Sequence, residues 1–229
     1  MREQYLETAD AMRIVNPYRY SAGVWTPPGT PDEWHYGNTT EGSGAWTDQS
    51  GNGNHAALVG SASIGANGLT GASTSDYATA GGSFGVNNTW TVSAWAFVPA
   101  DATGDIALVG GNVDSGTQTW LDRVAGPLWR LAHYDGAIDA GSTSSDLRGS
   151  WIHCAFSCAS GTLTIYRNAS SDGSGDSSIT ADEFTELGYV GGSKGLDGGF
   201  LDDVFIYDNE ALSGTDIADI YNNSPGTHV

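Results

Sequence analysis

Short apolar segments separated by turn-forming residues constrain this chain more than any other feature of its sequence. About ten segments alternate apolar and polar residues with the two-residue period of a β-strand, and long segments with the 3.6-residue period of a helix are absent. The expected strands are 55–60, 76–80, 89–98, 106–110, 118–124, 128–134, 151–158, 162–168, 186–191 and 200–208. Gly173–Asp182 is expected to be a loop. Many short strands with little helix predict an all-β sandwich of two packed antiparallel sheets.

The segment Leu201–Tyr207 is rich in β-branched and aromatic residues. Both of its faces are largely apolar, which predicts a central strand that is covered on both sides. Strict alternation divides its residues into one set of Asp202, Val204 and Ile206 and another of Leu201, Asp203, Phe205 and Tyr207. A strand of this kind needs a second layer on each face.

A short C-terminal helix is expected directly after this strand. Ser213 fits the N-cap position, and Asp216 follows three residues later in the position of a capping-box acid. Ile217, Ile220 and Tyr221 then lie at i, i+3 and i+4 and give the helix one apolar side. We therefore expect the helix to pack on the sandwich.

The charge of the chain is strongly negative, because 27 acidic residues oppose 8 Lys and Arg and give a net charge of −19. Such a surface repels nucleic acid and anionic membranes, so neither is expected as a partner. One interpretation is an ordinary acidic protein. The other is adaptation to high salt, where ions screen the self-repulsion of the fold. The presence of a single lysine, Lys194, favours the second interpretation. We therefore expect a protein of a halophile.

The two cysteines, Cys154 and Cys158, are four residues apart on one predicted strand. That spacing separates them by roughly 13 Å, because a strand rises about 3.3 Å per residue. A disulfide needs Cα atoms within about 7 Å. We expect both to be buried free thiols.

Four segments carry a family resemblance across about residues 45–208. They are Trp46–His55, Thr91–Trp95, Trp151–His153 and Gly199–Tyr207 with the helix that follows it. In this order they resemble the laminin G-like domains of the concanavalin A-like superfamily. The resemblance implies a jelly-roll domain over 21–229 and leaves an N-terminal arm over 1–20. The segment Tyr166–Ser170 departs from the family pattern, which has an Asp-Gly hairpin there.

The resemblance also implies a structural calcium site. In many laminin G-like domains, calcium lies near the loop that corresponds to Asp48–Asn54 and near the first Asp of the final strand. By position this nominates Asp48, Asn52 and Asp202 as ligands, with backbone carbonyls completing the six to eight oxygens that Ca²⁺ takes. The alternative is a loop in which Asp48 forms an Asx-turn with backbone amides.

No catalytic residue is predicted. Glycosidases of the superfamily carry a Glu-x-Asp-x-x-Glu strand that places two carboxylates on one face, and the sequence has no such segment. A serine nucleophile elbow, which joins a strand to a helix, and a phosphate-binding loop are not expected either. We expect a protein that is not an enzyme.

A ligand-binding face is expected in the segment Leu128–Asp135. Arg130 and Tyr134 are four residues apart, so a strand places both on one face, where they could contact a glycan. The alternative is that this face is only solvated.

Two classes of function remain. The first is a homo-oligomeric virion surface protein of a virus of a halophile, of the capsid decoration, turret or tail-fibre type, that contacts other virion proteins and binds a host surface glycan. It is suggested by a chain that starts at Met without an apolar signal segment, and by Val24–Pro27, which is similar to segments that precede such domains in phage structural proteins. The second is an extracellular carbohydrate-binding or adhesion module of a secreted cellular protein. A purely structural capsid role without a ligand is a third reading.

Overall fold

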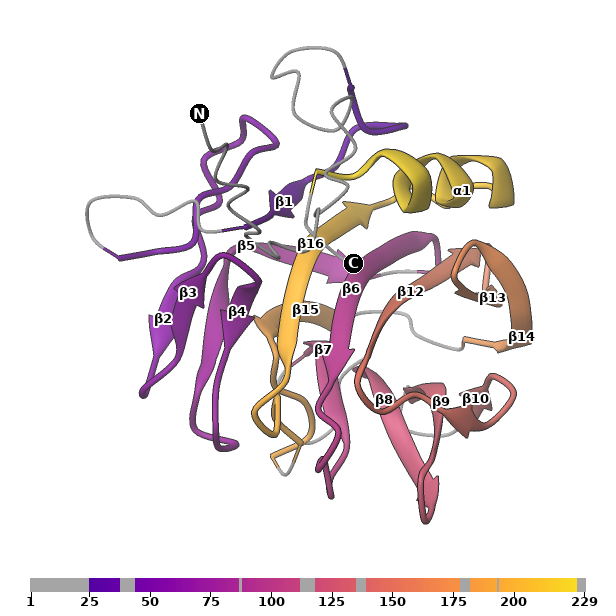
Figure 1. The fold of residues 1–229 in the computed structure, drawn as a ribbon. Coiled ribbons are helices and arrows are strands. Elements are labelled where there is room, and N and C mark those ends of the chain that lie inside the picture. Colours follow the sequence, from indigo (N-terminus) through magenta and orange to yellow (C-terminus); the bar gives the residue numbers. More distant parts are fainter. Residues whose placement is uncertain are drawn as a thin grey trace, which may run out of the picture.

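The computed structural model describes residues 25–37, 44–86, 88–111, 118–134, 139–177, 182–192 and 194–225. These residues form a sandwich of two antiparallel sheets with one helix against the outer face of one sheet (Figure 1). The all-β prediction with a short C-terminal helix is therefore confirmed. The expected arm, 1–20, and its boundary with the domain lie outside the described residues.

Each predicted segment overlaps a strand, and six strands lie outside the predictions or within the expected loop. The elements are β1 Glu33–His35, β2 Ala57–Val59, β3 Ser63–Gly65, β4 Gly68–Thr70, β5 Tyr77–Val86, β6 Trp90–Val98, β7 Ile106–Gly110, β8 Gln118–Ala125, β9 Leu128–Tyr134, β10 Asp139–Gly141, β11 Ser145–Asp146, β12 Ser150–Ala159, β13 Thr162–Arg167, β14 Ser170–Asp176, β15 Asp182–Leu187, β16 Phe200–Asp208 and α1 Gly214–Asn223.

The two sheets interleave strands from distant parts of the chain. The first, which we call sheet I, has the order β14-β13-β12-β6-β16-β4-β3, with β1 paired to β16. The second, sheet II, has the order β10-β9-β8-β7-β15-β5-β2, with β11 paired to β9. Consecutive strands such as β5, β6 and β7 alternate between the sheets, so the chain crosses the core repeatedly. This topology makes the two sheets mutually dependent.

The main core lies between the sheets and is supplied by the inward residues of both. In β6, Trp90, Val92, Ala94, Ala96 and Val98 all belong to this core. Their positions follow the strict alternation of the sequence, because successive strand residues point to opposite faces. The core also contains Cys154 and Cys158 as buried free thiols, as predicted.

The central strand β16 departs from strict alternation. Asp202 pairs with Trp95 and Phe205 pairs with Ser93, so β16 has one residue more than β6 between these pairs. This bulge is centred on Asp203, whose φ is 45°. As a result Leu201 lies in the main core with Val204, and the predicted division of faces is wrong for Leu201 and Asp202.

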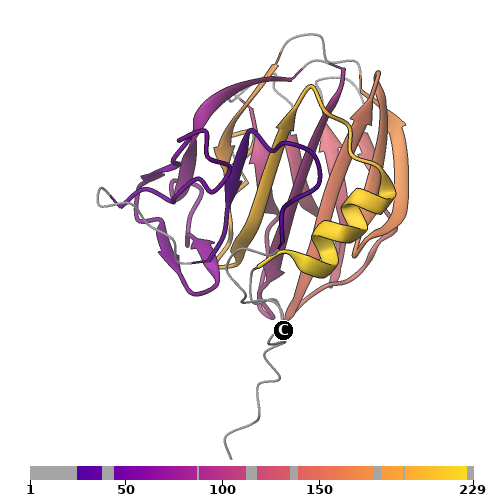
Figure 2. The same ribbon diagram turned by 90° about the horizontal axis from the view of Figure 1, so that it is seen from above.

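The outer face of sheet I is covered by α1, as Figure 2 shows. Ile217 and Ile220 of the helix pack with Phe205 and Tyr207 of β16 in a second apolar cluster. Ser213 and Asp216 form the predicted capping box. Within the described residues, no helix is both long and apolar enough to span a membrane.

The expected loop at Gly173–Asp182 is partly wrong, because β14 occupies its first residues and pairs with β13. An edge strand needs only backbone hydrogen bonds, so its polar sequence does not prevent pairing.

The segment Tyr166–Ser170, which departs from the family pattern in its residue types, still forms a two-residue turn between β13 and β14. Asn168 and Ala169 both have positive φ, 49° and 65°. This is the conformation that an Asn-Gly or Asp-Gly hairpin turn adopts.

The turn predicts a stabilising substitution. Alanine at positive φ costs about 1 kcal/mol relative to glycine, so we expect Ala169→Gly to raise the free energy of unfolding by about that amount. The Oδ1 atom of Asn168 accepts a hydrogen bond from the backbone N of His153, at 2.9 Å. The control Asn168→Ala should therefore destabilise the protein. Chemical denaturation measures both, and an Ala169→Gly variant that is less stable than the parent would contradict the assigned turn.

Candidate functional site

The outer face of sheet II brings together the polar and aromatic residues of β8 and β9. Gln118 lies opposite Tyr134, Trp120 opposite Ala132, and Asp122 opposite Arg130. The residues between them, including Leu121 and Leu131, belong to the main core. Since strand residues alternate, the three opposed pairs face outward.

Arg130 and Tyr134 share this face, as predicted, with Ala132 between them. Arg130 Nε donates to Asp122 Oδ2 at 2.8 Å, and the two side chains are 36% and 23% exposed. An ion pair this exposed adds little stability, but it orients the guanidinium. Gly141 of β10 lies beside it, and a Cβ there would be 3.1 Å from Arg130 Nη1. The absence of a side chain at Gly141 leaves room for the guanidinium.

A small apolar cluster forms the floor of this face. It consists of Ala107, Trp120, Ala132 and Val190, with Tyr134 half-buried against it. The ring of Trp120 is only 7% exposed, and its Nε1 has no hydrogen-bond partner within the described residues. The Nζ of Lys194 lies 4.6 Å from the centroid of the same ring. This is a cation–π contact.

A turn between β15 and β16 carries Lys194 onto the face. Val190 and Lys194 exchange two backbone hydrogen bonds of 3.1 and 3.2 Å, and Ala107 N donates to Gly195 O at 2.8 Å. This Val190–Lys194 turn is therefore fixed on β7. A Cβ on Gly191 would come within 2.7 Å of Gln118 Oε1, so the turn also touches Gln118.

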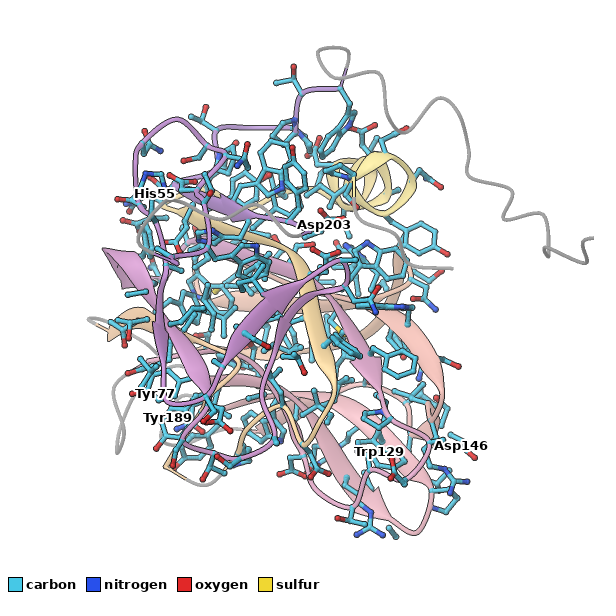
Figure 3. All side chains as sticks on the ribbon, turned by 60° about the vertical axis from the view of Figure 1, so that its left-hand side comes forward. His55, Tyr77, Trp129, Asp146, Tyr189 and Asp203 are labelled. Carbon is cyan, nitrogen blue, oxygen red and sulfur yellow. The ribbon has the colours of Figure 1, made fainter. Side chains whose placement is uncertain are left out.

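Tyr189 and Val190 lie over Gly110 of β7, where a Cβ would be 2.6 Å from Tyr189 O and from Val190 Cγ1. Gly110 lies between Gln118 and Glu186 in the sheet, so this segment divides the face into two parts. On the far side from β8 and β9, Tyr77 of β5 stacks on Tyr189 with ring centroids 4.9 Å apart (Figure 3). Glu186 of β15 lies on that side, opposite Thr79. Burial raises the pKa of the Glu186 carboxyl, although a hydrogen bond from Thr185 partly offsets this rise. Sequence reasoning missed Gln118, Trp120 and Lys194. Alternation within 118–124 would have placed the first two beside Tyr134, but no local signal places Lys194 there.

The loop after Trp46 is organised by Asp48. Its Oδ1 accepts hydrogen bonds from the backbone N of Trp34 and Ser50, and its Oδ2 accepts from Ser50 Oγ and the backbone N of Asn54, at 2.8–3.0 Å. Burial alone would raise the pKa of Asp48, but these hydrogen bonds outweigh it and hold the pKa below its usual value. The four donors occupy both oxygens. They favour the Asx-turn alternative over a calcium ligand.

The other two nominated calcium ligands also bind the protein itself. Asn52 Nδ2 donates to the carbonyl oxygens of Pro31 and Asp32. Asp202 Oδ1 accepts from the backbone N of Gly37 and Asp203, at 2.6 and 2.9 Å. Among the described residues, no group of three or more His, Cys, Asp or Glu side chains is arranged to hold a metal. Calcium at these residues stays a prediction.

Asp48→Asn tests the two alternatives. An amide nitrogen cannot accept the bonds that one carboxylate oxygen accepts, so we expect a loss of about 1–3 kcal/mol in the free energy of unfolding, with or without calcium. The stability that Asp48 contributes is present above the unfolded pKa and falls as pH drops through the lower folded pKa. Thermal melts of the parent protein and of Asp48→Asn, in calcium and in chelator, measure this loss of stability. A calcium-dependent rise in the melting temperature that Asp48→Asn abolishes would support the calcium site instead.

Comparisons with known proteins show which family this fold belongs to. A laminin G-type family model, described as the concanavalin A-like lectin/glucanases superfamily, matches residues 69–218, which is more than half of the chain. The Trp46–His55 segment lies before the matched range. No curated protein matches the sequence.

Solved structures match over most of the chain. The ligand-binding domain of botulinum neurotoxin serotype D, in complex with N-acetylneuraminic acid, is 14% identical with a TM-score of 0.63, covering 85% of this chain and 51% of that one. Trypanosoma rangeli sialidase with the inhibitor DANA is 17% identical with a TM-score of 0.66, covering 90% and 35%. The binding domain of paraclostridial mosquitocidal protein 1 is 16% identical with a TM-score of 0.62, covering 83% and 52%.

The chain thus spans about half of the toxin chains and about a third of the sialidase. These identities show a shared fold and not a shared activity. The family match, the two-sheet jelly roll and the C-terminal β16–α1 unit agree with one another, and the chain belongs to the concanavalin A-like lectin/glucanase superfamily.

Proposed function

We propose that this protein is a non-enzymatic glycan-binding protein whose site is the outer face of β8 and β9. The observation that carries the proposal is the grouping of Gln118, Tyr134 and the Arg130–Asp122 pair around an apolar floor. A half-buried tyrosine ring offers an apolar surface to the face of a sugar ring. The amide and guanidinium offer hydrogen-bond donors to hydroxyl groups. Few polar groups around an apolar surface are typical of ligand sites.

The charges on this face support binding and not hydrolysis. Most glycosidases, although not the sialidases, use two carboxyl groups about 5–9.5 Å apart across the scissile bond, with one of them free to donate a proton. Asp122 is held by Arg130, and Glu186 lies beyond the Val190–Lys194 turn. The superfamily and the neurotoxin domain crystallised with N-acetylneuraminic acid make carbohydrate the ligand class with most support.

For the biological setting, we propose a virion surface protein of a virus of a halophile, assembled as a homo-oligomer with other virion proteins. The support is compositional: 27 acidic residues, 8 basic residues and a net charge of −19. The alternative is an extracellular adhesion module of a halophilic cell. The acidic surface argues against nucleic acid as a partner in both settings.

Tyr134→Ala tests the site. We expect it to weaken binding to a glycan extract of the host surface about tenfold, because stacking on an aromatic ring is worth about 1 kcal/mol or more. Tyr189→Ala is the matched control, since it removes the same side chain from the other part of the face. Biolayer interferometry measures both, and chromatography of the recovered glycan checks that it stays intact. Weaker binding by Tyr189→Ala alone would contradict the site, and cleavage would contradict the non-enzymatic role.

Light scattering in about 2 M KCl, chosen to screen the surface charge, tests assembly. The virion reading predicts a closed oligomer for the full chain and a smaller species after deletion of residues 1–20. A monomer in both samples would favour the extracellular adhesion module.

A further inference from the structure

Lys194 differs from the arginines in the charges around it. Among the described residues, Arg130, Arg148 and Arg167 are each paired with an aspartate, and Arg123 donates to two backbone carbonyls. The Nζ of Lys194 instead lies over Trp120, and no carboxylate of the described residues lies within 4.0 Å of it. The single lysine of a chain with 27 acidic residues therefore forms no ion pair with a described acidic residue.

Trp120 adds a second donor to the same place. Its Nε1 is buried and has no hydrogen-bond partner within the described residues. Leaving such a donor unsatisfied is unfavourable, so buried donors are normally paired. Because this atom has almost no accessible surface, a ligand oxygen can reach it only if neighbouring side chains move.

Lys194 adjoins one described acidic residue, Asp105, through the parallel bridge of Gly195 with Ile106. Asp105 Oδ1 accepts a hydrogen bond from the backbone N of Arg123 at 2.9 Å and forms no ion pair with the ammonium. Gln118, which touches the same turn, is neutral, and the Arg130–Asp122 pair on the face has no net charge. Glu186 belongs to the other part of the face, beyond the turn. Lys194 thus carries a positive charge that no described carboxylate pairs, on a protein whose net charge is −19.

We propose that the β8–β9 part of the face is a subsite for an acidic saccharide, with the sugar carboxylate bound by the Lys194 ammonium. The inference rests on the proposed glycan function and names the class of sugar. The cation–π contact with Trp120 fixes the ammonium on one side and leaves N–H donors for a ligand oxygen. The net negative charge of the protein does not attract an acidic saccharide at long range, because it repels anions. In about 1 M salt the Debye length is about 3 Å, so a direct contact is what selects the charge.

Isothermal titration in 2 M KCl with two probes of equal length, a tetrasaccharide of uronic acids and a tetrasaccharide of glucose, tests this subsite. We expect the parent protein to bind the uronate at least about tenfold more tightly, because a hydrogen bond between an ammonium and a carboxylate is stronger than one between neutral groups. Lys194→Gln should remove that preference, so that the two probes bind with similar affinity. Lys194→Arg should keep the preference.

Arg148→Gln is the matched control, because it changes the net charge equally at a cation that is paired with Asp146 away from the face. Equal affinity of the parent for both probes, or a preference that survives in Lys194→Gln, would overturn the acidic subsite while leaving glycan binding intact. Loss of the preference in Arg148→Gln would assign it to net charge and overturn the subsite as well. Failure of the parent to bind either probe or the host extract would overturn the glycan function itself.

Discussion

The structure depends on β16, which is paired along both edges and buried on both faces. One edge pairs with β6, and the other is shared by β4 and β1. Its bulge at Asp203 turns Leu201 and Val204 to the main core while Phe205 and Tyr207 receive α1. Gly68 shows how closely β4 approaches, because a Cβ there would lie 2.2 Å from the carbonyl oxygen of Leu201. The sandwich and its helix are thus held by one strand.

Several acidic side chains stabilise local turns, because their carboxylates accept hydrogen bonds from backbone N–H groups. Asp48 accepts hydrogen bonds from the backbone of its own loop, and Asp76 accepts from Ser61 and Ser73 in the same way. Asp197 accepts from the backbone of Thr103 and Gly104. Backbone N–H groups take the place of the cations that the chain lacks. A carboxylate can therefore order a turn in a protein with few lysines and arginines, and the contact does not depend on a mobile ion pair.

Sequence periodicity predicted the fold where alternation is regular and failed where it is broken. In β6, the residues from Trp90 to Val98 alternate without interruption, and every second one belongs to the main core. In β16, a non-glycine residue at positive φ shifts the register by one, and no residue type signals this at Asp203. The residues of the candidate site were likewise predictable in part. Arg130 and Tyr134 follow from alternation within one strand, whereas Lys194 reaches Trp120 through a turn from a distant segment, which only the tertiary structure determines.

The central place of β16 also has a consequence for synthesis. β6 ends at Val98 and β16 begins at Phe200, so about a hundred residues must be added before the centre of sheet I can close. At about 5–20 residues per second, that interval lasts about 5–20 s. During it the edge of β6 that pairs with β16 has no partner. Contacts this distant in sequence slow folding and expose strand edges to neighbouring chains. A ribosome that pauses between β6 and β16 therefore holds the chain in its most aggregation-prone state.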